Sequence, residues 1–180
     1  MDYKMFRVIN QLAGRYSSLD LLLILISKKI RYVFMFILIF MWFRNYLQRK
    51  VILYAVISAA FTLVINTLIK CFYFKPRPFI KHRVGILIPS KMDSSFLSKH
   101  TLLTFAVSTS IFLHKRVLGS VMWGLSLLTG FSRIWLGHHY PSDIIRSIFI
   151  GSLTSVIIDK FACFLKRLNR KIKAVSCSKI

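Results

Sequence analysis

The stretch VILYAVISAAFTLVINTLI, residues 51–69, contains no charged side chain. A helix rises about 1.5 Å per residue, so crossing the hydrocarbon core of a bilayer takes about 20 apolar residues. The length and composition of this stretch therefore predict a transmembrane helix. Two later segments, 117–136 and 144–165, are similarly apolar and also have the length to cross. We expect both to span the membrane, with their few charged side chains near its two surfaces.

Three shorter apolar segments complete the pattern. Residues 101–113 can span if their helix begins within 96–100, and residues 32–43 can span with flanking residues or local thinning of the bilayer. Residues 19–26 are too few to cross, so the first 27 residues are expected to form an interfacial amphipathic helix with a partial insertion. The predicted fold is an all-α, polytopic transmembrane helix bundle with five to six spans and a short interfacial N-terminal helix.

The composition excludes an ordinary soluble domain. Hydrophobic residues make up 56% of the 180 residues, and 27 Lys and Arg stand against five acidic residues, for a formal charge of +22. A nucleic-acid-binding domain of this charge needs a solvated basic face, whereas here the basic residues interrupt apolar segments. We expect one membrane-embedded domain over residues 1–165 and a basic cytoplasmic tail over 166–180.

The charges between the segments bear on orientation. The connections after residues 32–43 and 101–113 and the tail are rich in Lys and Arg, which by the positive-inside rule indicates the cytoplasmic side. The opposite side is basic as well, so counting charges is ambiguous unless some of its cations have another role. Lys75 is interpreted as an anchor at the membrane surface, whereas Lys70 and Arg77 are candidates for binding an anion.

Reactive side chains cluster at the ends of the predicted spans on this second side. Because consecutive spans form hairpins, three separate clusters are expected to meet on one face. Their members are Lys70 and Arg77 after the second span, Ser98, Lys99 and His100 before the next, and Ser132, Arg133, His139 and Asp143 after the one that follows.

This combination of residue types suits phosphoryl transfer. Guanidinium and ammonium groups stabilise the charge on phosphate oxygens, one imidazole can attack phosphorus, and a second can protonate the leaving oxygen. His139 and Asp143 are four residues apart, so on a helical turn the carboxylate would reach a ring N–H and fix the tautomer. With no carboxylate pair and no Cys/His spacing typical of a metal site, we expect neither a metal nor another cofactor. The predicted reaction passes through a phosphohistidine.

At these residues the sequence resembles the type-2 phosphatidic acid phosphatase superfamily, whose signatures are K-x6-RP, PSGH and SR-x5-H-x3-D. Lys70 with Arg77-Pro78 matches the first, and Ser132-Arg133 with His139 and Asp143 matches the third. Stretches 73–79 and 128–141 further resemble the bacterial undecaprenyl-diphosphatases of the bacitracin-resistance type. This similarity covers about residues 1–165.

The resemblance implies a role for each matching residue. It makes His139 the nucleophile, Asp143 its partner and His100 the general acid. The residues that it implies for phosphate binding are Lys70, Arg77, Arg133, Ser98 and, through its backbone N–H, Lys99.

The second signature departs from the family pattern. Leu97 stands where proline is expected, and Lys99 stands where glycine, or aspartate in the undecaprenyl branch, is expected. A lysine beside the pocket can either clash or add a cation for a diphosphate. If the position requires positive φ, any residue but glycine costs about 1–2 kcal/mol there.

The resemblance implies removal of the terminal phosphate of undecaprenyl diphosphate at the outer face of a bacterial cell membrane, which recycles the cell-wall lipid carrier and gives bacitracin tolerance. The expected partners are that lipid, or a related lipid phosphate, and membrane lipids, with no nucleic acid. One alternative is a phosphatase for phosphatidylglycerophosphate or phosphatidate. Another is a non-catalytic protein, either a permease component or a lipid-binding protein.

Overall fold

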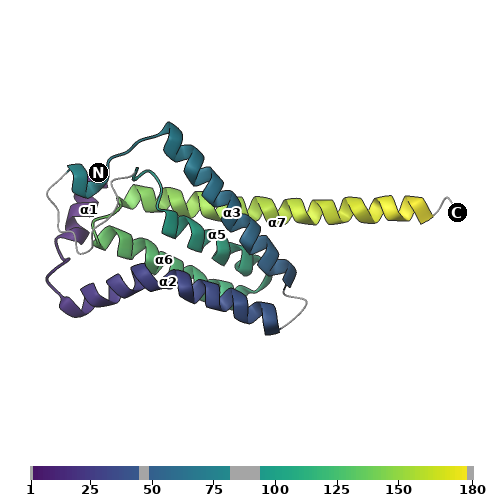
Figure 1. Ribbon diagram of the computed structural model, residues 1–180, viewed down its shortest axis with the longest axis horizontal. Coiled ribbons are helices and arrows are strands. Elements are labelled where there is room, and N and C mark those ends of the chain that lie inside the picture. Colours follow the sequence, from purple (N-terminus) through teal and green to yellow (C-terminus); the bar gives the residue numbers. More distant parts are fainter. Residues whose placement is uncertain (1, 45–48, 82–93, 178–180) are drawn as a thin grey trace.

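The computed structural model describes residues 2–44, 49–81 and 94–177. All regular structure in these residues is helical, as predicted, and the last three residues of the predicted tail lie outside them. The helices are α1 (Asp2–Asn10), α2 (Ser17–Arg44), α3 (Arg49–Phe72), α4 (Pro78–Lys81), α5 (Lys99–His114), α6 (Arg116–Trp135) and α7 (Pro141–Cys177) (Figure 1).

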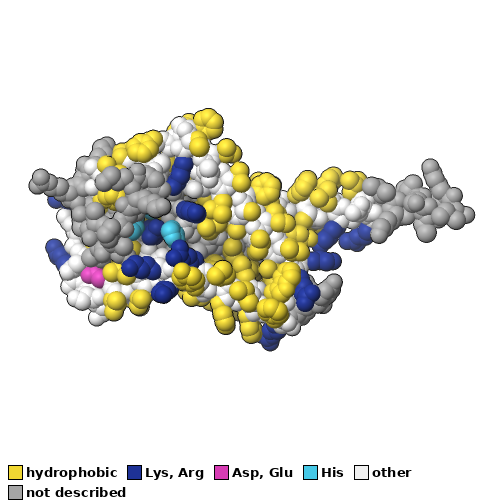
Figure 2. Space-filling model, in the orientation of Figure 1, with side chains coloured by type: hydrophobic (Ala, Val, Ile, Leu, Met, Phe, Trp, Pro, Cys, Tyr) yellow, Lys and Arg dark blue, Asp and Glu magenta, His cyan; other side chains and the backbone are white. Residues whose placement is uncertain are grey.

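In the part of the chain that the structure describes, three helices are long and apolar enough to cross a membrane: α3, α6 and the Pro141–Arg170 part of α7. They coincide with the three long apolar segments of the sequence. Large apolar side chains gather over the middle of the bundle on the face seen in Figure 2, and Phe61 and Phe149 are 57% and 71% exposed. Exposed apolar surface of this extent fits contact with lipid. The predicted tail continues α7 as a helix through Cys177 and extends away from the bundle (Figure 1).

The N-terminal region differs from the prediction. Segments 19–26 and 32–43 belong to one continuous helix, α2, of 28 residues. The connecting residues 27–31 contain neither glycine nor proline, so nothing in the backbone ends the helix there. Ser27 and Ile30 are also buried, which holds this part of the helix against the bundle. As a result, Arg31 lies in the middle of α2.

Helix α5 is the centre of the bundle and packs against α3, α6 and α7. Small hydroxyl side chains line its contacts: Ser110 lies 3.2 Å from Ser58 of α3, and Ser108 lies 3.3 Å from Ser126 of α6. Small residues that hydrogen-bond across an interface allow membrane helices to approach closely. These contacts fix the height of the α5 N-terminus relative to its neighbours.

The approach of α7 to α5 is closer still. A Cβ atom at Gly151 would lie 2.6 Å from the carbonyl oxygen of Leu102, a distance that real Cβ atoms essentially never show. Glycine at this position therefore lets the start of α7 lie beside the start of α5, where the predicted site residues are.

Helix α1 covers this end of the bundle (Figure 1). Phe6 is fully buried and meets the Tyr140 ring edge-on, with the ring centroids 5.5 Å apart. The Asn10 side chain donates a hydrogen bond of 2.9 Å to the carbonyl of Trp135 at the end of α6. The short N-terminal helix that was predicted is thus packed onto the connection between α6 and α7.

Candidate active site

The turn between α6 and α7 positions His139. Arg133 lies in the last turn of α6, and its carbonyl accepts hydrogen bonds from the backbone N–H groups of His138 and His139, at 3.0 and 3.3 Å. Gly137 has a φ of 77°, a conformation that glycine adopts without steric cost. The turn therefore fixes His139 close to Arg133.

The His139 ring is buried, with only 2% of the residue exposed. Its Nδ1 lies 3.3 Å from both the Oγ and the carbonyl oxygen of Ser95. Burial lowers the pKa of His139 well below its ordinary value, and the positive charges of Arg77 and Arg133 lower it further. The ring is therefore neutral near pH 7. With the Nδ1–H directed at Ser95, the Nε2 lone pair is left for nucleophilic attack.

Asp143 was expected to contact the His139 ring directly. It does not, because Ser95 lies between them. The Ser95 hydroxyl donates a 2.8 Å hydrogen bond to Asp143 Oδ2 and can accept one from His139 Nδ1. The carboxylate thus orients the imidazole through a hydroxyl rather than directly.

The start of α7 explains this difference. The helix begins at Pro141, so His139 precedes it and the four-residue spacing does not form a helical turn. Asp143 instead lies in the first turn, where its Oδ2 accepts a 3.0 Å hydrogen bond from the backbone N–H of Tyr140. This is the reciprocal half of a capping box.

Lys75 is part of the site rather than a membrane anchor. Its Nζ lies 2.6 Å from Asp143 Oδ1 and 3.4 Å from Asp2 Oδ2. Asp2 also accepts a 3.0 Å hydrogen bond from the backbone N–H of Ser142. Burial by itself would raise the pKa of Asp2, but its bonds to Ser142 and the Lys75 charge lower it overall. Helix α1 therefore helps to hold the carboxylate that orients the histidine.

His100, in the first turn of α5 and ahead of the apolar segment 101–113, contacts Arg133. One Arg133 nitrogen donates a 2.9 Å hydrogen bond to His100 Nδ1, and another donates one of 2.7 Å to Ser27 of α2. Burial lowers the pKa of His100 to about 3, and the charges of Arg133, Arg31 and Lys99 act in the same direction. Arg133 thus acts on both candidate catalytic histidines.

Ser98 and Lys99 begin helix α5. Ser98 is its N-cap, and its Oγ accepts from the backbone N–H of Thr101 at 3.5 Å. Lys99 is exposed. No described residue other than glycine has a positive φ, so the steric cost considered for Lys99 does not arise. Leu97, in place of the family's proline, is buried in the protein. The phosphate contacts of Ser98 and Lys99 stay predictions.

The two charged residues of the first signature lie at either end of the connection between α3 and α4. Arg77 is buried immediately before α4, and its charge acts on His139. Lys70 lies half-buried in the last turn of α3. The structure thus brings Arg77, Arg133, His100 and His139 into one site. Phosphate binding by Arg77, Arg133 and Lys70 stays a prediction.

Sequence reasoning missed Ser95, Lys75, Ser27 and Arg31. Ser95 and Ser27 belong to none of the signatures, and no local pattern marks them. Arg31 had a usable signal, because a charge within an apolar helix of a membrane protein is costly and is usually retained for function. Among the described residues, no group of three or more His, Cys, Asp or Glu side chains is placed to hold a metal ion.

Comparison with known proteins defines the class. The model of the PAP2 superfamily matches residues 50–164, and the chain belongs to that superfamily. The resemblance seen in the sequence is therefore confirmed, and the chain is a multi-pass membrane phosphatase homologue. The matched residues leave out α1 and α2.

Particular relatives can be named within this class. The chain is 39% identical to undecaprenyl-diphosphatase BcrC of Bacillus subtilis (strain 168), over 92% of this chain and 86% of that protein. It is 30% identical to the bacitracin transport permease protein BcrC of Bacillus licheniformis, over 85% and 76%. The crystal structure of Aquifex aeolicus LpxE superposes with a TM-score of 0.77 at 26% identity, covering 88% of this chain and 94% of that one.

Proposed function

We propose that the protein removes the terminal phosphate of undecaprenyl diphosphate and so regenerates undecaprenyl phosphate. The observation that carries the proposal is the buried, neutral His139, whose Nδ1 is bonded to Ser95 and whose surroundings include Arg77 and Arg133. The diphosphate substrate is suggested by the similarity to a protein named undecaprenyl-diphosphatase.

In the first step, His139 Nε2 attacks the terminal phosphorus. A P–N bond forms while the bond from phosphorus to the bridging oxygen breaks, and its electron pair goes to that oxygen. Arg77 and Arg133, with Lys70, stabilise the charge on the transferring phosphoryl group. The Ser95–Asp143 pair stabilises the positive charge that develops on the His139 ring.

His100 protonates the leaving oxygen in this scheme. Without substrate the ring is neutral, and its Nδ1 accepts from Arg133. A bound diphosphate adds negative charge beside the ring and offers Arg133 better acceptors, and both effects favour the protonated imidazole. His100 thereby gains its proton when the substrate is in place.

In the second step, water attacks the phosphohistidine. His100, now neutral, takes a proton from that water while the P–N bond breaks and its electron pair returns to His139 Nε2. Inorganic phosphate leaves, His100 releases the proton that it took from water to the solvent, and both histidines return to their starting states. Acid and base roles alternate on one side chain, as general acid–base catalysis requires.

The membrane arrangement belongs to the same proposal. Residues 32–43 of α2 and 101–113 of α5 join α3, α6 and α7 to make five spans, within a single domain over residues 1–165. The tail from residue 166 lies in the cytoplasm, which places the site at the outer face. Its basic residues support this orientation.

The decisive experiment compares purified wild-type protein with His139→Ala. We expect the wild type to release phosphate from undecaprenyl diphosphate in the presence of EDTA and to form an acid-labile phosphoprotein, and the variant to do neither. Phosphatidate and phosphatidylglycerophosphate are assayed in parallel, and equal or better turnover of either overturns the substrate assignment. Bacitracin protection that survives His139→Ala would support the permease reading instead.

A further inference from the structure

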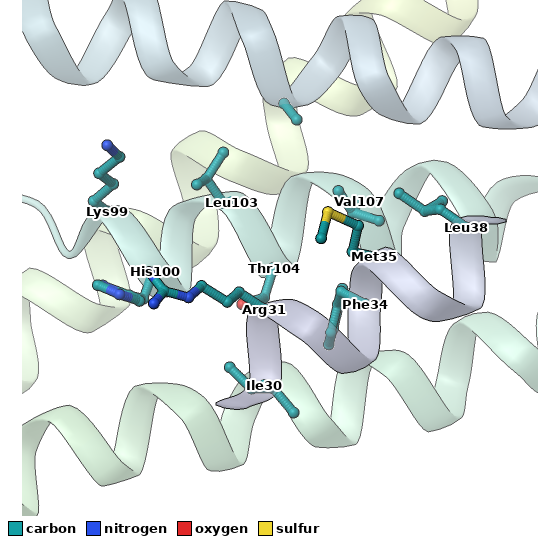
Figure 3. Close-up of a pocket in the computed structure, with 11 residues that line it drawn as sticks. Ile30, Arg31, Phe34, Met35, Leu38, Lys99, His100, Leu103, Thr104 and Val107 are labelled. Atoms are coloured by element: carbon teal, nitrogen blue, oxygen red, sulfur yellow. The ribbon is translucent and has the colours of Figure 1, made fainter. Parts of the chain in front are cut away.

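A cleft of about 410 Å³ lies between α2, α3 and α5, beside the general acid of the proposed reaction. Figure 3 shows that its two ends differ in chemistry. Along most of its length the walls are apolar apart from Thr104, and the three charged or titratable side chains stand at one end. The apolar walls include Phe34, Met35, Leu38, Leu103 and Val107, and the polar end is formed by Arg31, Lys99 and His100.

The two cations at the polar end come from different helices. The Arg31 side chain runs from α2 toward His100 (Figure 3), and its Nη2 donates a 3.2 Å hydrogen bond to the Tyr32 hydroxyl. Both Arg31 and Lys99 are exposed. Within the described part of the chain, neither has a carboxylate at ion-pair distance. Cations in such apolar surroundings are costly unless an anion accompanies them.

We propose that Arg31 and Lys99 bind the phosphate that stays on the lipid when the terminal phosphate is removed. The occupant of the cleft is the beginning of that lipid's hydrocarbon chain. This inference rests on the proposed function, and it makes Arg31 a residue that selects lipid diphosphates over lipid monophosphates.

The order of groups along the site supports this assignment. In the proposed reaction His139 attacks the terminal phosphorus beside Arg77 and Arg133. His100 protonates the bridging oxygen. The groups that line the cleft with His100 therefore meet whatever follows the bridging oxygen in the substrate. In a diphosphate that group is a second phosphate, which carries negative charge, whereas in a monoester it is the uncharged hydrocarbon chain.

Arg31 is also well suited to this task. Its guanidinium can form two parallel hydrogen bonds to phosphate oxygens, and the developing negative charge on the leaving lipid phosphate strengthens them. It lies on α2, outside the residues 50–164 that match the superfamily model. The proposed selectivity is therefore a property of a helix that the superfamily match does not include.

The test uses two substrates that share one chain, farnesyl diphosphate and farnesyl monophosphate, with the full-length protein in detergent. We expect Arg31→Gln to lower kcat/KM for the diphosphate by about 10- to 100-fold, as expected for losing hydrogen bonds to a charged group. For the monophosphate the loss is expected to stay below about threefold. Arg31→Lys, which keeps the charge, should lose less than Arg31→Gln.

Lys28→Gln is the matched control, because Lys28 is an exposed cation of the same helix that does not line the cleft. It should leave both rates unchanged. Inhibition by orthovanadate reports on the His139 pocket, and it should be the same in wild type and Arg31→Gln if the variant is folded. A variant that loses vanadate inhibition as well shows that Arg31 supports the whole site, and this result contradicts the proposal.

Two further outcomes separate this inference from the proposed function. If the wild type hydrolyses neither farnesyl nor undecaprenyl diphosphate, the proposed function itself is wrong. If the wild type hydrolyses diphosphates but Arg31→Gln lowers kcat/KM equally for the diphosphate and the monophosphate, only the proposed subsite for the second phosphate is wrong.

Discussion

The two histidines of the site lie in opposite environments. His139 is buried, and its Nδ1 is bonded to Ser95, which in turn is bonded to Asp143. His100 is half-buried at the polar end of an open cleft, and its contacts are with cations, Arg133 above all.

This contrast matches what each proposed role demands. A nucleophile needs a fixed tautomer and a neutral ring before the substrate arrives, and burial with a defined partner at Nδ1 supplies both. A general acid must change its protonation with the substrate, and a ring among cations does so when a dianion binds. Burial and nearby cations lower the pKa of both rings, so the two proposed roles differ in what each ring contacts and not in its protonation before substrate binds.

The largest effect is expected at the buried histidine. His139→Ala should reduce turnover by about 10⁴-fold or more, because the covalent intermediate of the proposed reaction forms on this ring. Radiolabelled substrate, quenched at alkaline pH, should label the wild type and leave this variant unlabelled. Residual labelling of the variant would place the nucleophile elsewhere.

Replacing the half-buried histidine should reduce turnover less. His100→Gln is expected to lower turnover by about 10²–10⁴-fold, the usual contribution of a general acid. Because His139 remains, a substrate with a good leaving group, such as a nitrophenyl phosphate, should recover part of the rate. If this substrate recovers nothing, His100 acts in binding rather than as an acid.

The bridge to Asp143 should contribute about tenfold. Ser95→Ala leaves Asp143 in place but removes the hydroxyl between carboxylate and imidazole, a loss of about 1–3 kcal/mol for a buried hydrogen-bonding group. We expect kcat to fall while KM changes little, because the positive charge on His139 develops only in the transition state. Ser94→Ala, one residue earlier, is the control; an equal loss there would indicate a general effect on the loop.

The buried histidine should also make stability depend on pH. Because the pKa of His139 is lowered in the folded protein, the unfolded chain binds a proton that the folded protein does not as the pH falls below about 6.5. The free energy of unfolding should therefore fall by about 1.4 kcal/mol from this group at pH 5.5. Thermal unfolding of wild type and His139→Gln at pH 7.5 and 5.5 measures this contribution. The prediction is wrong if both proteins lose the same stability between the two pH values.

The smallest effect is expected at Lys99. Lys99→Gly restores the usual residue of the second signature, and since Lys99 has no positive φ it relieves no strain. The loss of one exposed cation should lower diphosphate turnover by about threefold and leave monophosphate turnover unchanged. A large gain in kcat/KM for the variant would show that Lys99 impairs the natural protein.

The membrane helices and most of the candidate site could be predicted from the sequence alone. Apolar length is a local property, so residues 51–69, 117–136 and 144–165 could be assigned without knowing their neighbours. The reactive residues stand at fixed offsets next to these helices, and hairpin topology leaves one face where His100, Arg133 and His139 can meet. For these residues, position along the chain nearly fixes position in space.

The contacts of those residues could be seen only in the folded protein. Ser95 reaches His139 and Asp143 from 44 and 48 residues away, and Arg133 reaches Ser27 across 106 residues. Such contacts depend on how closely α5 approaches α7 and on where α2 lies, which small side chains and a single glycine control. Because these packing distances leave no periodic trace in the sequence, the hydroxyl bridge and the place of Arg31 at the cleft emerged only from the assembled bundle.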